Sequence, residues 1–81
     1  MDLQDIQNEL YLLEKKVQSY NHSGKILLQD EVKIKKEIMD LSITLLKITS
    51  STISERWRRY LLKRRIQRLY LKIDSLKTIY N

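Results

Sequence analysis

The sequence has no cysteine, no proline and a single glycine in 81 residues. Without cysteine, neither a disulfide framework nor a thiolate metal site can form, and the composition is compatible with a reducing compartment. Without proline, and with Gly24 as the single glycine, few residues interrupt a helix. The composition therefore predicts long helices and an all-α fold.

Residues suited to catalysis are also scarce. His22 is the single histidine, and no second histidine, cysteine or serine motif is present with which it could form a triad or a metal site. The Rossmann, P-loop, zinc-finger and HExxH patterns do not occur. We therefore expect a protein that is not an enzyme, with no cofactor, no metal and no small-molecule substrate.

No long apolar segment is present. The most apolar stretch, residues 41–46, is far shorter than the ~20 residues that cross a bilayer, and Asp40 and Lys47 flank it. The N-terminal residues are acidic and lack the basic and apolar regions of a secretory signal. We expect a soluble intracellular protein, either cytoplasmic or nuclear.

The positive charge lies in the last third of the chain. Residues 51–81 contain nine lysines and arginines and two acidic residues, whereas residues 1–50 contain seven lysines and eight acidic residues. The two parts have formal charges of +7 and −1, and all six arginines lie between Arg56 and Arg68. Such asymmetry indicates a polyanionic partner for one part of the molecule.

The hydrophobic spacing predicts a first helix at about 2–20. Its apolar residues alternate spacings of three and four, as in a coiled-coil seam: Leu3, Ile6, Leu10, Leu13, Val17 and Tyr20. Asp2 and Asp5 are placed to complement the positive end of the helix dipole. Asn21 and Gly24 predict a turn, because both residue types readily adopt the left-handed conformation that ends a helix.

A second helix is predicted at about 25–49, and it is apolar over more than half of its circumference. One stripe consists of Leu27, Ile34, Ile38, Leu41, Leu45 and Ile48, and a second stripe beside it of Leu28, Val32, Met39, Ile43 and Leu46. A helix this apolar needs two neighbours. We therefore expect it to be central, with the first and third helices packed on it.

A third helix is predicted at about 53–80. Thr52 and Glu55 fit a capping box at its start. The expected fold is a single domain over residues 1–81, in which a helical hairpin and a basic C-terminal helix form a coiled-coil-like bundle. The alternative is one continuous rod of about 120 Å at 1.5 Å per residue, because one heptad frame continues from Leu3 to Tyr80. Polar residues cluster in that frame at the two breaks, which favours the bent chain.

Residues 3–48, with Ile34, Lys35, Lys36, Glu37 and Ile38 in the second helix, resemble in outline the small two-helix hairpin proteins of the large ribosomal subunit. The similarity covers little more than half of the chain and consists mainly of coiled-coil spacing. The acidic start and the additional basic helix depart from that family, so we do not assign the chain to it.

The third helix has two distinct faces at 100° per residue. One is an apolar stripe suited to the core, formed by Leu62, Ile66, Leu69, Ile73, Leu76 and Tyr80. The opposite face combines aromatic, aliphatic and arginine side chains: Trp57, Tyr60, Leu61, Arg64, Arg68 and Leu71. Guanidinium groups pair with phosphate, and aromatic rings stack on bases, so this face suits RNA or single-stranded nucleic acid.

The candidate nucleic-acid-binding residues are Arg56, Trp57, Arg58, Arg59, Tyr60, Lys63, Arg64, Arg65, Arg68 and Lys72. RNA is slightly favoured over DNA, and the protein is expected to be a component or accessory of an RNA–protein particle. Two other interpretations stay open: a solvated or intramolecular face, and a coiled-coil adaptor or scaffold that associates with its own copies or with a partner helix. A membrane-surface role is less favoured.

Overall fold

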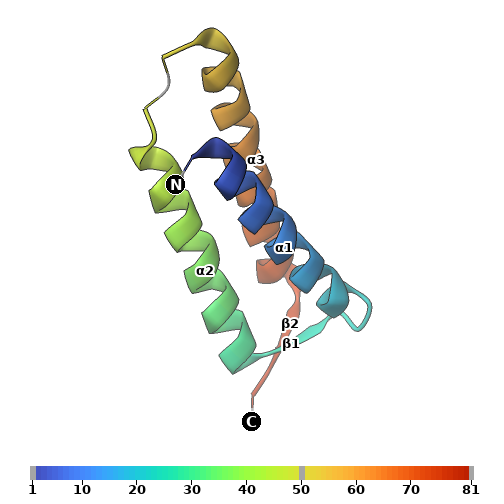
Figure 1. The fold of residues 1–81 in the computed structure, drawn as a ribbon. Helices are drawn as coiled ribbons and strands as arrows, with labels where there is room; N and C mark the ends of the chain where they lie inside the picture. The colour runs from blue at the N-terminus through green and yellow to red at the C-terminus, as the bar shows by residue number, and fades with distance from the viewer. Residues whose placement is uncertain (1, 50, 81) are drawn as a thin grey trace.

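Three helices and two short strands make up the described part of the chain, residues 2–49 and 51–80 of a computed structural model. In order, the elements are α1 (Leu3–Asn21), β1 (Lys25–Leu27), α2 (Leu28–Lys47), α3 (Ile53–Ser75) and β2 (Lys77–Ile79). The chain reverses direction twice, so that the helices lie side by side along the long axis (Figure 1). The Cα atoms extend 47 × 19 × 16 Å.

The prediction of an all-α three-helix bundle is confirmed. Each helix packs against the two others around one shared core. The alternative of a continuous rod is wrong, because the longest dimension is 47 Å. The heptad frame that runs through both turns therefore does not form a single seam.

The helix starts are set by side-chain caps. Asp2 accepts a hydrogen bond from the Asp5 amide at 2.9 Å, and Asp5 accepts one in return from the Asp2 amide at 3.3 Å. The Thr52 hydroxyl accepts from the Glu55 amide at 3.1 Å, which confirms Thr52 as the N-cap of α3. The Glu55 carboxylate accepts from the Ser51 amide rather than from that of Thr52, so the reciprocal bond lies one residue earlier than predicted. Ser50, which is part of this break, lies outside the described residues.

The predicted turn after α1 is also present. Gly24 has φ of +69°, the left-handed conformation that glycine adopts without a Cβ clash. Its amide donates to the carbonyl of Tyr20 at 3.0 Å and so closes the end of α1. The carbonyl of Gly24 then accepts from the Lys77 amide at 2.9 Å. The turn thereby starts the pairing of two strands that lie far apart in the sequence.

Those two strands correct the predicted helix boundaries. Residues 25–27 pair in parallel with residues 77–79, with Ile26 opposite Thr78. The second helix therefore begins at Leu28 instead of Lys25, and the third ends at Ser75 instead of Tyr80. The extended backbone turns Ile26 into the core, where it is 1% exposed, whereas Tyr80 is 75% exposed and does not continue the buried stripe of α3.

The core consists of one stripe from each helix. Its buried residues are Leu3, Ile6, Leu10, Leu13 and Val17 of α1, Ile34, Ile38, Leu41 and Leu45 of α2, Leu62, Ile66, Leu69 and Ile73 of α3, and Ile26 and Leu76 beside the helices. Tyr20 and Ile48 are partly buried against them. The predicted stripes of α1 and α3 are therefore confirmed apart from Tyr80, and the first stripe of α2 is confirmed apart from Leu27, which is half-buried in β1.

The second stripe of α2 is solvent-exposed, contrary to the prediction that it packs on a neighbour. Its members Leu28, Val32, Met39, Ile43 and Leu46 are 41–62% exposed. The reason is geometric: α1 and α3 contact each other as well as α2, so both pack against the first stripe. A three-helix arrangement leaves the other stripe without a neighbour within residues 2–49 and 51–80.

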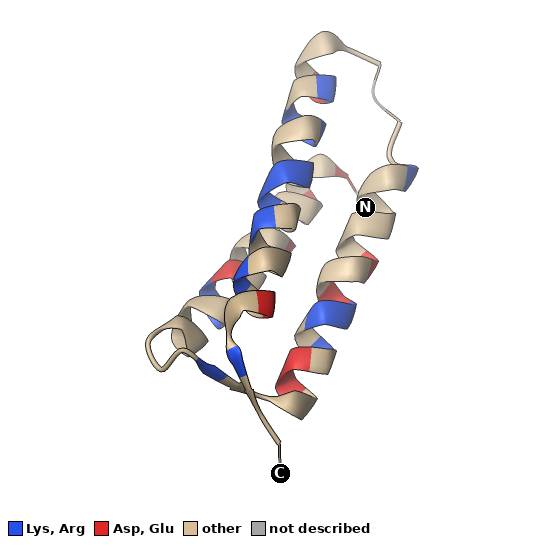
Figure 2. Cartoon of the chain, turned by 180° about the vertical axis from the view of Figure 1, so that it is seen from behind, with Lys and Arg blue, Asp and Glu red and all other residues tan. Residues whose placement is uncertain are grey.

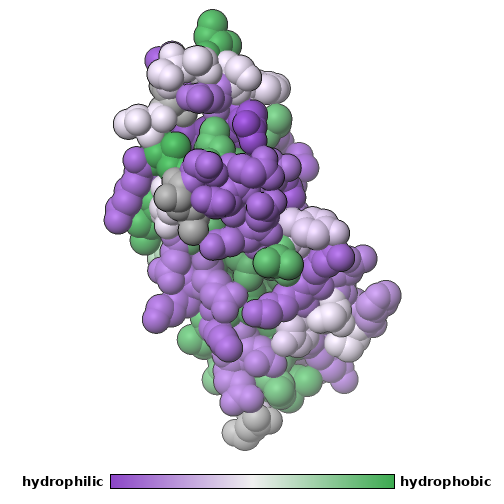
Figure 3. All heavy atoms as spheres, viewed as in Figure 1, coloured by the Kyte–Doolittle hydropathy of each residue, from purple (hydrophilic) through white to green (hydrophobic). Residues whose placement is uncertain are grey.

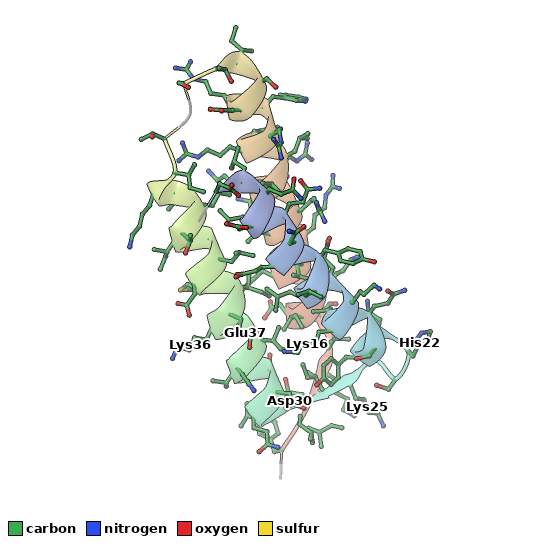
Figure 4. The ribbon with its side chains drawn as sticks, in the orientation of Figure 1. Lys16, His22, Lys25, Asp30, Lys36 and Glu37 are labelled. Carbon is green, nitrogen blue, oxygen red and sulfur yellow. The ribbon has the colours of Figure 1, made fainter. Side chains whose placement is uncertain are left out.

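Each pair of helices is also joined by an ion pair. These are Glu14 with Arg65 between α1 and α3, Lys16 with Glu37 between α1 and α2, and Lys35 with Asp74 between α2 and α3. Lys16 and Glu37 point toward each other, 3.7 Å apart (Figure 4). Partly exposed pairs of this kind contribute little free energy, but opposite charges at matched positions favour this register of the helices over shifted ones.

Candidate nucleic-acid interface

All ten predicted site residues lie on α3. Seen from behind, lysine and arginine positions follow this helix over most of its length (Figure 2). Eight of the ten are exposed, namely Arg56, Trp57, Arg58, Tyr60, Lys63, Arg64, Arg68 and Lys72. Arg59 and Arg65 are half-buried.

The two half-buried arginines make contacts within the bundle. Arg65 forms an ion pair with Glu14 of α1, and Arg59 donates to the carbonyl of Leu46 in the last turn of α2 at 3.3 Å. A helix end leaves its last carbonyls without helical partners, so Arg59 satisfies one of them. These two members of the predicted site therefore also stabilise the packing of α3.

The aromatic members form a small stack on the surface. The ring centroids of Trp57 and Tyr60 are 5.6 Å apart and inclined by 26°, and the Arg64 guanidinium lies 5.9 Å from the centroid of Tyr60. These rings are 60% and 47% exposed, so both have ring surface in contact with solvent. Residues three and four apart adjoin on a helix, which explains how the spacing creates a platform of two rings and a cation.

The exposed cations lie on three sides of α3. Arg64 and Arg68 point away from the core with Trp57, as predicted from their positions opposite the buried stripe. Arg58 and Lys72 line hollows toward α1. Arg56 and Lys63 line a hollow toward α2, together with Leu46 and Tyr60. The predicted site is therefore a collar around α3, with Trp57 on the outward side and Tyr60 between that side and α2.

No acid interrupts this collar. The segment from Arg56 to Ile73 contains no aspartate or glutamate. The two acids at the ends of α3 have intramolecular partners, because Glu55 accepts from the Ser51 amide and Asp74 pairs with Lys35 at 3.1 Å. The middle turns of α3 therefore present a positive potential that their own helix does not neutralise.

A second polar cluster, not predicted from the sequence, ties the C-terminal strand to the helices. Glu31 accepts hydrogen bonds from the Thr78 hydroxyl at 2.7 Å and from Lys35 at 3.1 Å, which lower the pKa of its carboxyl. The same bond with Glu31, followed by that with Asp74, raises the pKa of Lys35. The Lys35 ammonium also lies 5.4 Å from the centroid of the Tyr70 ring. The cluster is a structural clasp, because its charges pair with each other.

A similar contact holds the turn between α1 and α2. Tyr20 donates to the Asp30 carboxylate at 3.1 Å. Burial raises the pKa of the Tyr20 phenol, and the bond to Asp30 and its negative charge act in the same direction. His22 is exposed in the adjoining turn and lies apart from Asp30 and Glu37 of α2 (Figure 4). The bond between Tyr20 and Asp30 therefore joins the end of α1 to the first turn of α2.

Within residues 2–49 and 51–80, no helix is both long and apolar enough to pass through a bilayer. That part of the chain also contains no group of three or more histidine or acidic side chains arranged to hold a metal ion. The collar on α3 is the candidate site because it combines exposed cations with a pair of stacked aromatic rings.

Comparison with known proteins found no similarity: no protein-family model matches the chain, and neither a curated protein nor a solved structure matches it.

Proposed function

We propose that this is a non-enzymatic nucleic-acid-binding protein that contacts phosphates and bases through the outward side of α3. The observation that supports this best is the exposed stack of Trp57 and Tyr60 beside Arg64 and Arg68, in a segment without acids. A solvated face needs charge but has no need of two half-exposed rings held together at 5.6 Å.

Each group has a chemical part in the proposed interaction. Arg64 and Arg68 form bidentate hydrogen bonds to phosphate oxygens, for which the planar guanidinium is suited. The exposed ring of Trp57 stacks on an unpaired base, an interaction that is tolerant of sequence. The proposed ligand is therefore a single strand or an RNA loop, whose unstacked bases are accessible, and RNA is favoured over duplex DNA. A component or accessory of an RNA–protein particle would use such a surface.

The first test is binding to labelled single-stranded RNA and to duplex DNA across a salt series, by fluorescence anisotropy. We expect binding that weakens steeply with salt, because neutralised phosphates release counterions. The double variant Arg64→Glu/Arg68→Glu should lower the slope of log K against log salt for single-stranded RNA by about 1.4, at ~0.7 for each lost phosphate contact.

The control variant is Lys33→Glu/Lys36→Glu, which makes the same change in net charge at two exposed positions of α2. It should retain the slope of the wild type. Equal losses in both variants show dependence on net charge alone and contradict the assigned face. Absence of RNA binding by the wild type at moderate salt contradicts the function itself.

The second test uses Trp57, the single tryptophan of the chain. Stacking on a base should quench its fluorescence when single-stranded RNA is added. Heparin has the charge without the bases, so it should bind without the same quenching. Equal quenching by both ligands shows that Trp57 does not stack on bases, and the role of α3 is then limited to charge.

A further inference from the structure

An exposed apolar surface covers the side of the bundle formed by α2 and α3. It comprises Leu28, Val32, Met39, Ile43 and Leu46 of α2 with Tyr70 and Leu71 of α3, each 37–65% exposed. We call this set the apolar flank. The side on which α1 lies in front is mostly hydrophilic, and its apolar side chains form small separate patches (Figure 3).

The flank is hollowed along the line between the two helices. One hollow of about 420 Å³ lies among Met39, Ser42, Gln67, Tyr70 and Leu71, above the buried side chains Ile38 and Ile66. A second hollow of about 350 Å³ continues from Ser42 toward Leu46, Arg56, Tyr60 and Lys63. Because Ser42 lines both, the two hollows form one groove. Figure 2 shows the molecule from behind, with α3 in front of α1 and α2 beside α3.

We propose that the apolar flank is the interface with a second copy of this chain, packed about a two-fold axis with α2 antiparallel to α2. The area fits such a contact. Seven large apolar side chains, each 37–65% exposed, would form the centre of the contact, and a standard interface buries about 800 Å² per partner. The polar rim at Arg56, Lys63 and Gln67 supplies the remainder.

The residue spacing makes the flank complementary to itself. Val32 and Leu46 each lie seven residues from Met39, on the same side of α2. With the two-fold axis beside Met39, Val32 of each copy therefore packs on Leu46 of the other, as a two-fold contact requires.

The charges fit the same arrangement. The groove is basic at the end where α3 begins, through Arg56 and Lys63, and the opposite end of α3 carries Asp74, whose side chain is 60% exposed. Antiparallel packing places the basic end of each copy over the partly exposed Asp74 carboxylate of the other, beside its ion pair with Lys35. A carboxylate accepts several hydrogen bonds, so Asp74 can keep its contact with Lys35.

The dimer leaves Trp57, Arg64 and Arg68 of the proposed nucleic-acid face open, because they point away from the core. Tyr60 and Leu71 lie at the border of the two surfaces, since Tyr60 lines the groove and Leu71 belongs to the flank. The dimer would carry two such faces, on the two α3 helices. The proposed dimer does not depend on nucleic-acid binding, because the molar mass of the protein can be measured in the absence of RNA.

The first experiment is sedimentation equilibrium of the full chain, which should show twice the 9.8 kDa of one chain. Met39→Glu should raise the dissociation constant by roughly thirty-fold or more, because it places two carboxylates beside the axis of a packed interface. The control is Leu12→Glu, an equally exposed apolar position on α1, which should leave dissociation unchanged.

Interfaces of standard area have dissociation constants in the micromolar range or below. The proposal is therefore overturned if the wild type is still a monomer at about 100 µM. Dissociation by Leu12→Glu but not by Met39→Glu also overturns it, because a different face is then responsible. Far-ultraviolet circular dichroism shows whether each variant remains folded, as expected for changes at exposed positions.

The second experiment uses the absence of cysteine from the chain. Met39→Cys should form a disulfide-linked dimer on mild oxidation, because residues beside a two-fold axis face their own copies within the Cα distance that a disulfide allows. Lys33→Cys, exposed on another side of α2, should remain monomeric under the same oxidation. Rapid cross-linking through residue 33 but not through residue 39 contradicts the proposed axis.

Discussion

The contrast between Ile26 and Leu27 tests the least expected part of the fold. If α2 began at Lys25, its helical phase would bury Leu27 beside Ile34 and expose Ile26. In the structure residues 25–27 form a strand, so Ile26 is 1% exposed and Leu27 is only half-buried. Alanine substitutions at the two positions should therefore have different effects on the free energy of unfolding.

Ile26→Ala removes a fully buried side chain and should lower that free energy by about 2–5 kcal/mol, the range for such changes in cores. At 4–8 °C per kcal/mol for a domain of this length, its Tm should fall by at least about 8 °C. Leu27→Ala should cost less than half as much, because Leu27 loses only part of its contacts.

The assay is urea unfolding followed by circular dichroism at 222 nm, at one protein concentration so that association affects all samples equally. If the free energy of unfolding falls with urea concentration at the same slope in both variants, the two variants expose the same amount of surface on unfolding. A larger loss for Leu27→Ala than for Ile26→Ala would refute the strand and return residues 25–27 to α2.

Three further perturbations test the turn, the cap of α3 and the clasp. Gly24→Ala should lower the free energy of unfolding by about 1–2 kcal/mol, because φ is +69° and a residue with a Cβ is strained in this left-handed conformation. The added Cβ would meet no atom within 4 Å, so the backbone strain is the whole effect. Equal stability of the variant and the wild type in urea contradicts the left-handed conformation. Thr52→Ala should cost about 1 kcal/mol and Thr52→Ser much less, since a hydroxyl caps the Glu55 amide. Because folding lowers the pKa of Glu31, its carboxylate stabilises the fold at pH values above its ordinary pKa of 4.5. This stabilisation is lost as the pH falls through the pKa of the folded state. Unfolding from pH 7 to 2 should therefore show a steeper acid decline for the wild type than for Glu31→Gln, and parallel curves contradict the clasp.

The sequence was sufficient to predict most of the bundle because local chemistry sets most of it. The stripe from Leu3 to Val17 has one phase and one apolar face, so its burial follows from helical geometry alone. Thr52 and Gly24 have recognisable local roles as a cap and as a left-handed residue, and the structure places both in these roles.

The strands could not be predicted, because they depend on a pairing across fifty residues. Ile26 and Thr78 are opposite each other only after three helices have brought them together. The apolar spacing of α3 continues through Leu76 to Tyr80, so nothing local marks its end at Ser75. Likewise, the apolar spacing of the second stripe of α2 predicts that it is buried, but the spacing alone does not show that α1 and α3 both pack on the first stripe instead.

The candidate site was predicted as a set of residues, but its division among roles depends on packing. Arg65 and Arg64 are neighbours of the same type, yet only Arg65 meets an acid of α1, because one residue turns the helix by 100°. The aromatic stack was foreseen as a mixed face, whereas the bond from Arg59 to α2 requires knowledge of how the two helices meet.

Charge balance is a physical reason for proposing an external partner for the outward side of α3. The chain has sixteen lysines and arginines against ten acids, so complete internal neutralisation is not possible. The acids that meet α3 do so at Arg65 and at its last turn, and the segment containing Arg64 and Arg68 is left with neutral aromatic neighbours. Clustered like charges raise the free energy of the free protein, and an anion that approaches them lowers it. A phosphate backbone would supply such anions at regular spacing, and in the proposed interaction Trp57 would add stacking on a base, which charge alone does not provide.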